Sequence, residues 1–110
     1  MIENTLNEIE ANIRSAKSIS EERKRELLQL LDTLKSEVGK LSGNYEEQAQ
    51  SITGFAQLSA REATRTKQNP QSLQHSLEGL RSSVEGFEKS HPKLVEIVNN
   101  ISNTLANLGI

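Results

Sequence analysis

The chain has 110 residues, of which 34% are hydrophobic and 25% charged, and its 13 basic and 15 acidic residues give a formal net charge of −2. It has no cysteine, which excludes disulfide frameworks, thiol catalysis and cysteine-ligated metal centres. The slightly acidic charge and the small number of aromatic side chains argue against nucleic-acid binding, which depends on basic fields and stacking platforms.

The first two predicted helices have apolar residues spaced alternately four and three apart, the period of helices that pack against a neighbour. We expect the first helix over residues 2–17. Ser18 and Ser20, followed by Glu21 and Glu22, predict the start of a second helix over residues 21–42, because hydroxyls cap free amides and acidic side chains suit the positive end of the helix dipole. Gly43 is expected to end this helix in the left-handed conformation.

A third helix is expected over residues 45–68, with Asn44 and Glu47 arranged as a capping box at its start. Its apolar row contains small residues and is interrupted by Ser59, and Gly54 lies in its interior. We therefore expect it to be the weakest helix, frayed or ordered only on assembly.

Prolines introduce the last two predicted helices. Asn69 followed by Pro70 predicts a capped start for a fourth helix over residues 70–89. Pro92 begins a fifth helix over residues 92–108, where Gly109 and Ile110 suit a glycine-type helix end.

These five segments predict an all-α fold within a single domain over residues 1–110. We expect an antiparallel helical bundle, or coiled-coil hairpins, of four to five helices, left-handed and with crossing angles near +20°. The second and fifth predicted helices carry an apolar face that is wider than packing against one neighbouring helix would cover. This correspondence is either a weak repeat, in which two hairpins pack with their broad faces inward, or a coincidence between leucine-rich heptads. The residues that widen the two faces are Leu28, Leu30, Val95 and Ile97.

The C-terminal sequence FEKSHPKLVEIVNNISNTLANLGI resembles the signature of a bacterial family of small helical proteins described only as a domain of unknown function. The first hairpin, Leu6 to Leu41, is also similar to the N-terminal half of that family, whereas the middle, Gly43 to Gln71, is longer and less leucine-rich. The resemblance implies a small soluble bacterial helical protein and provides no catalytic residue or cofactor. The positions that carry the signature are Phe87, Glu88, His91, Pro92, Leu105, Gly109 and Ile110.

Ser90, His91 and Pro92 form a helix-entry motif, in which we expect His91 to cap amides, to pack against Phe87 or simply to fix the turn rather than to act in catalysis. The alternative is a small-ligand or metal-binding bundle that uses His91, Glu88 and His75. Glu88 and His91 have the spacing of a Glu-x-x-His motif, but they straddle a predicted helix break, and one pair does not make a site. The chain has no glycine-rich phosphate loop, Ser-His-Asp signature or H-E-x-x-H motif, so we expect no enzymatic activity and no cofactor.

We therefore expect a non-enzymatic, soluble helical-bundle protein that serves as a self-associating scaffold or a protein-interaction adaptor. Its expected partner is itself, as a homodimer or higher oligomer, or another protein. No apolar run approaches the roughly 20 residues of a membrane span, and the N-terminal sequence is acidic where a secretory signal is basic, so we expect a cytoplasmic location and no membrane partner. The candidate interface residues are Leu28, Leu30, Phe55, Leu58, Val95 and Ile97, and the candidate basic patch for a partner is Arg61, Arg65 and Lys67.

Overall fold

The computed structural model describes residues 2–41 and 43–108, and in this part of the chain it has five α-helices and no strand. This confirms the predicted all-α bundle. A short 3₁₀-helix, η1 (Gly43–Tyr45), precedes the third α-helix. The α-helices are α1 (Ile2–Ser15), α2 (Glu21–Gly39), α3 (Glu46–Ala63), α4 (Pro70–Ser82) and α5 (Pro92–Leu108).

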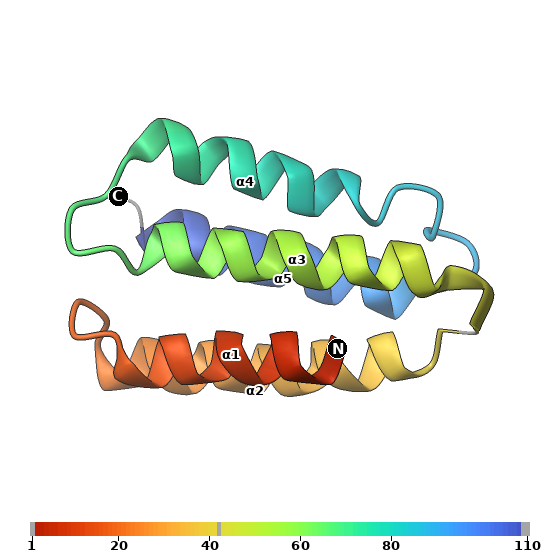
Figure 1. The fold of residues 1–110 in the computed structure, drawn as a ribbon, viewed down its shortest axis with the longest axis horizontal. Helices are drawn as coiled ribbons and strands as arrows, with labels where there is room; N and C mark the ends of the chain where they lie inside the picture. Colours follow the sequence, from red (N-terminus) through yellow and green to blue (C-terminus); the bar gives the residue numbers. More distant parts are fainter. Residues whose placement is uncertain (1, 42, 109–110) are drawn as a thin grey trace.

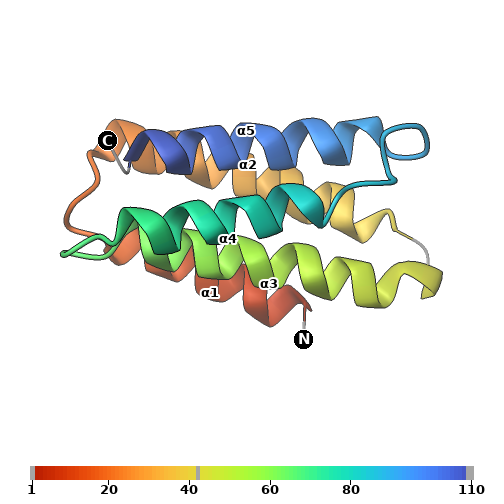
Figure 2. The same cartoon turned by 90° about the horizontal axis from the view of Figure 1, so that it is seen from above.

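Helices α1, α2, α3 and α5 pack in a ring, and α4 adds its buried leucines to the same core from beside α3 and α5. Both α1 and α5 pack against α2 and α3, and α4 packs against α3 and α5 (Figures 1 and 2). Consecutive helices run in opposite directions, so α1, α3 and α5 point the same way (Figure 1). The two helices with the widest apolar faces, α2 and α5, pack against each other, as expected for two hairpins with their broad faces inward.

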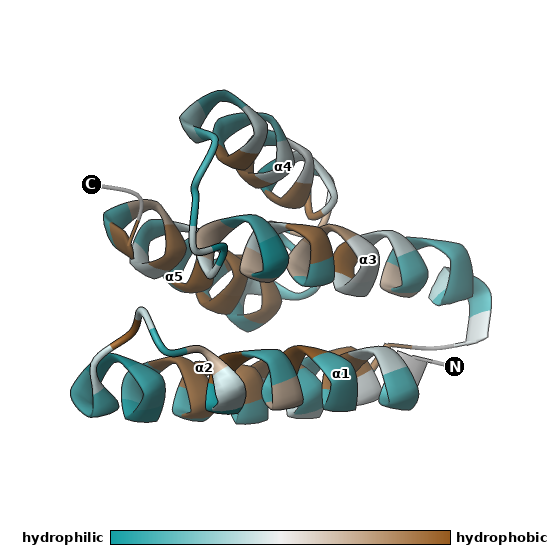
Figure 3. Ribbon diagram, turned by 60° about the vertical axis from the view of Figure 1, so that its left-hand side comes forward, coloured by the Kyte–Doolittle hydropathy of each residue, from teal (hydrophilic) through white to brown (hydrophobic). Residues whose placement is uncertain are grey.

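The apolar residues of the heptad rows are buried between the helices together with some serine and threonine residues, and the hydrophilic positions lie mainly on the outside (Figure 3). Leu34, Leu80, Leu94 and Val98 are fully buried. The residues that widen α2 and α5 are accommodated within the chain: Ile97 is buried, and the other three pack half-buried against the core.

The third helix is a central element of the bundle and is continuous over Glu46–Ala63, so the structure does not show the fraying that its composition predicts, and its relative stability stays a prediction. It lies against α1, α4 and α5. Small side chains on a helix allow the backbones of neighbouring helices to approach closely. The alanine and serine residues that replace leucine in the apolar row of α3 are therefore sites of close helix packing. The buried residues of α3 are Ala49, Ile52, Thr53, Ala56, Ser59, Ala60 and Ala63.

Four helices end earlier than the apolar spacing predicts: α1 at Ser15, α2 at Gly39, α3 at Ala63 and α4 at Ser82. The carbonyl groups at the last turn of α3 are capped from outside the helix. The amide nitrogen of the Gln68 side chain donates to the Ala63 carbonyl oxygen at 2.7 Å, so the backbone leaves the helix before residue 68.

The predicted fourth helix, residues 70–89, is shortened most because its second part runs as turns. Ser83 Oγ donates to the Leu80 carbonyl oxygen at 2.5 Å, and Gly86 adopts a left-handed φ of +97°. Val84 and Phe87 remain buried although they lie outside the helix. The apolar spacing thus continues through a segment that is not helical.

The predicted helix starts are confirmed where a side chain caps the first turn. Ser20 Oγ accepts from the Arg23 amide at 3.2 Å, and Asn69 Oδ1 accepts from two amides at the start of α4. The predicted caps around Gly43 are wrong, because this glycine belongs to η1 without a left-handed φ, and Tyr45 precedes α3 without a side-chain cap. The predicted glycine end at residues 109 and 110 lies outside the described residues.

Two buried serine hydroxyls, those of Ser59 and Ser102, have no hydrogen-bond partner among the described residues. Burying an unpaired hydroxyl is unfavourable, so we expect Ser59→Ala and Ser102→Ala each to raise the free energy of unfolding by about 1 kcal/mol. Urea unfolding followed by circular dichroism measures this change. Ser76→Ala is the control, because Ser76 Oγ donates to the Leu73 carbonyl oxygen at 2.8 Å and its loss gives no such gain. A loss of stability in both core variants would show that their hydroxyls are bonded.

Candidate functional site

The helix-entry motif is part of an aromatic cluster at one end of the bundle. The His91 ring packs edge to face against Phe87 and Tyr45, with ring centroids 5.5 and 6.0 Å apart, and the Tyr45 and Phe87 rings are 5.3 Å apart. His91 Nδ1 lies 2.9 Å from Ser90 Oγ. Pro92 begins α5, as predicted. The predicted packing of His91 against Phe87 is confirmed, and the imidazole serves to join the turns after α4 to the start of α5.

The side chains of the metal-binding alternative do not converge. Glu88 is exposed and accepts a 2.8 Å hydrogen bond from the Gly86 amide, while His91 belongs to the aromatic cluster. His75 lies on α4, on the surface beside Phe55 and Leu58. In the described part of the chain, no three histidine or carboxylate side chains are placed to hold one metal ion together.

A surface groove between α3 and α4 brings together two of the predicted interface residues. Phe55 is 38% exposed and Leu58 is 42% exposed, more than the half-buried Leu28, Leu30 and Val95. The groove has a volume of about 410 Å³. We call this surface the α3–α4 face, and its lining residues are Phe55, Leu58, Glu62, Ser72, His75 and Ser76.

A glycine on α4 determines where the Phe55 ring lies. A Cβ atom added at Gly79 would be 2.3 Å from Phe55 Cε1, a distance that two carbon atoms do not tolerate. The ring therefore rests directly against the backbone of α4. With Ser72 and Ser76, this glycine forms a row of small residues spaced four and three apart beside the buried leucines of α4. This row is the sequence signal that points to the groove, and it was not part of the prediction.

The other four predicted interface residues lie elsewhere. Leu28 and Leu30 are on α2 and Val95 is on α5, all half-buried against the core. Ile97 is only 5% exposed, so it is covered within the single chain and does not contribute to an outer surface. Only Phe55 and Leu58 of this group form one exposed apolar surface.

The predicted basic patch is divided between different surroundings. Arg65 forms an ion pair with Glu62, with Nη1 and Oε1 3.1 Å apart. Arg61 lines a polar groove between α1 and α3 that also contains Glu8, and exposed Lys67 lies in the loop after α3. The three basic side chains thus lie in different surroundings, and their role toward a partner stays a prediction.

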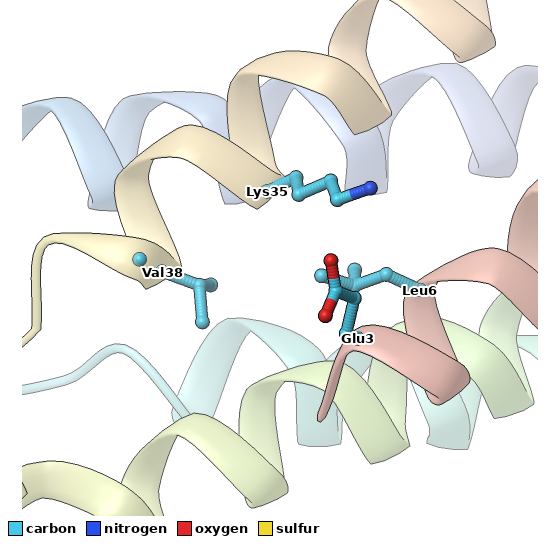
Figure 4. Close-up of a pocket in the computed structure, with 5 residues that line it drawn as sticks. Glu3, Leu6, Lys35 and Val38 are labelled. Atoms are coloured by element: carbon cyan, nitrogen blue, oxygen red, sulfur yellow. The ribbon is translucent and has the colours of Figure 1, made fainter. Parts of the chain in front are cut away.

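A further groove of about 320 Å³ lies where the start of α1 meets the end of α2 (Figure 4). Leu6 and Val38 form its apolar part, and Glu3 and Lys35 stand beside it. Both apolar residues belong to the buried core. This groove is therefore the open end of the α1–α2 packing, and its two large apolar residues are buried, whereas the two on the α3–α4 face are exposed.

A family model described as "Domain of unknown function (DUF4404)" matches residues 27–110. The matched part contains most of α2 and all of α3, α4 and α5, so it includes the α3–α4 face. The sequence resemblance was extended to the first hairpin, Leu6 to Leu41, but the match begins only at Leu27. No curated protein and no solved structure matches the chain. Among the described residues, no helix combines the length and the apolar character that crossing a membrane requires.

Proposed function

Because the chain belongs to the DUF4404 family, whose function is not known, we propose a function from its surface: the protein is a non-enzymatic protein-interaction module. The observation that carries this proposal is the α3–α4 face, where Phe55 and Leu58 are exposed beside a groove. Exposed large apolar side chains that are grouped on one surface mark sites of association more often than single ones do.

The shape of the groove suits a helical ligand. Its α4 side is formed by the small residues Ser72 and Ser76 together with His75, and its α3 side carries the two large apolar residues beside Glu62. An amphipathic helix binds in this kind of groove by placing its own apolar residues between the large ones. The buried leucines of α4 hold this helix against the bundle, so the groove is formed before a partner arrives.

The proposal that the protein is not an enzyme is supported by the surroundings of His91, the imidazole of the helix-entry motif. The His91 ring is packed against Tyr45 and Phe87, which supports a structural role for it at the helix entry.

We propose that the protein acts in the cytoplasm, because a chain without cysteine has no disulfide that a reducing environment would break. Fractionation of cells that express a tagged chain tests this location.

A photo-crosslinking amino acid at position 58 tests the proposed function. Because Leu58 lies in the centre of the proposed interface, we expect irradiation in cells to crosslink this position to a partner polypeptide. Mass spectrometry of the adduct identifies the partner and the segment that is crosslinked. The matched control is the same amino acid at exposed position 29 on α2, away from α4 (Figure 1). Absence of adducts at position 58, or equal adducts at both positions, would contradict the proposal.

A further inference from the structure

We propose that α4 is a conformational latch, which opens reversibly from α3 and α5 while α1, α2, α3 and α5 stay folded. The latch consists of residues 69–86, that is, the N-cap of α4, the helix itself and the turns that follow it. The structure shows the closed state, in which the buried leucines of α4 hold it in place. Three properties of the chain support this device: a ring of helices that is complete without α4, anchored ends of the latch, and a weak helix between them.

The ring of α1, α2, α3 and α5 is complete without α4. Each of these helices packs against two others of the ring, and α4 lies on the side of α3 and α5 away from α1 and α2 (Figures 1 and 3). A small internal cavity is lined by two residues from each ring helix, among them Ile13, Leu31, Ala60 and Leu105. Loss of a ring helix would therefore open the centre of the bundle, whereas opening of α4 uncovers one outer side of α3 and α5.

The chain is anchored to the ring on both sides of the latch. Before it, the Gln68 side-chain amide donates to the carbonyl oxygens of Ala63 and Leu108 at 2.7 and 3.2 Å. After it, the Phe87 ring is buried in the aromatic cluster. The latch spans roughly 60 Å when it is fully extended, which exceeds the 38 Å long axis of the structure. It can therefore open without pulling either anchor out of the ring.

Helix α4 has little tendency to form without its neighbours. It has 13 residues, and helices of this length are marginal in water when no tertiary contacts support them. Its interior contains the weak helix formers Ser72, His75, Ser76 and Gly79. Segments that depend on few buried apolar side chains open at a lower free energy than the core does. The leucines on which the closed state of α4 depends are Leu73, Leu77 and Leu80.

Opening of the latch takes the α3–α4 face apart. The residues that α4 contributes to the groove, Ser72, His75 and Ser76, move away from Phe55 and Leu58 on α3. A partner that binds this face binds the closed state alone, so it shifts the equilibrium toward that state. This consequence rests on the proposed function, whereas the opening is a property of the chain itself.

Native-state hydrogen exchange of the full chain, followed by NMR, tests the latch. We expect the hydrogen-bonded amides of α4 to exchange at least about 100-fold faster than the slowest amides of α2, α3 and α5. We also expect the α4 amides to share one opening constant, because the helix opens as a unit.

Two substitutions distinguish opening of the latch from unfolding of the whole chain. Ile13→Val, in the ring interior, is expected to speed exchange of the slowest ring amides about two- to tenfold. It leaves exchange in α4 unchanged, because Ile13 stays buried when α4 opens. Leu77→Ala, on the buried side of α4, is the matched variant. It is expected to speed exchange in both α4 and the ring, because the contacts of Leu77 are lost in both kinds of opening.

Two results would overturn the inference: α4 amides that exchange as slowly as the slowest ring amides, or Ile13→Val speeding exchange in α4 as much as in the ring. Either result means that α4 unfolds only with the whole chain. Hydrogen exchange needs no partner, so its outcome is separate from that of the crosslinker at position 58. If the crosslinker captures nothing while α4 opens as expected, the proposed function fails and the latch stands.

Discussion

Replacing Ile52 by alanine is expected to lower the free energy of unfolding by about 2–5 kcal/mol. Ile52 is fully buried in α3, the helix that packs against α1, α4 and α5. The substitution removes apolar contacts and leaves a cavity that these neighbours do not fill. Because small domains have a total stability of only about 5–15 kcal/mol, the change removes a large part of it. Urea unfolding followed by circular dichroism measures the effect.

Leu58→Ala provides a matched control on the same helix. Leu58 is 42% exposed, so its truncation removes little buried surface from the single chain, and we expect a change below about 1 kcal/mol. The comparison also tests whether α3 is ordered in the single chain, as in the structure, or frayed, as its sequence predicts. A helix that is frayed in the isolated chain would tolerate both substitutions equally, which is the result that would contradict the structure.

Helix number and most helix starts were predictable from the sequence because their causes are local. The apolar spacing defines each helix, Ser20 and Asn69 accept hydrogen bonds from amides within one turn, and Pro92 has a fixed φ that suits the first helical position. The ends depend on contacts between distant residues. Gln68, for example, donates to the carbonyl oxygens of both Ala63 and Leu108, 40 residues further along the chain. No spacing rule contains such a bond, so the prediction extended α3 too far.

The candidate site was predictable only in part for a similar reason. Phe55 and Leu58 stand out in the sequence as large apolar residues off the main row of their helix. The groove beside them needs the small residues of α4, and these become meaningful only once α3 and α4 are known to be neighbours. The same applies to the wide apolar faces of α2 and α5, which suggested an intermolecular surface. Because these two helices pack against each other, the bundle itself covers Ile97.

Replacing Gly86 by alanine is expected to lower the free energy of unfolding by about 1–2 kcal/mol. Gly86 has a φ of +97°, and it lies between Val84 and Phe87, which are both buried. A side chain at this φ is strained, and the turn cannot relax without moving one of its buried neighbours. A Cβ atom at position 86 has nothing within 4 Å, so the expected loss comes from backbone conformation and not from a clash.

Gly54→Ala separates this conformational effect from a general response to alanine. Gly54 lies in the interior of α3, is exposed, and has open space around an added Cβ atom. Alanine is favoured over glycine in a helix by up to about 1 kcal/mol, so this variant is expected to be more stable than the native chain. Thermal unfolding of the two variants should therefore shift in opposite directions. If Gly86→Ala also raises the melting temperature, the segment after Ser82 does not form the left-handed turn and continues as a helix instead.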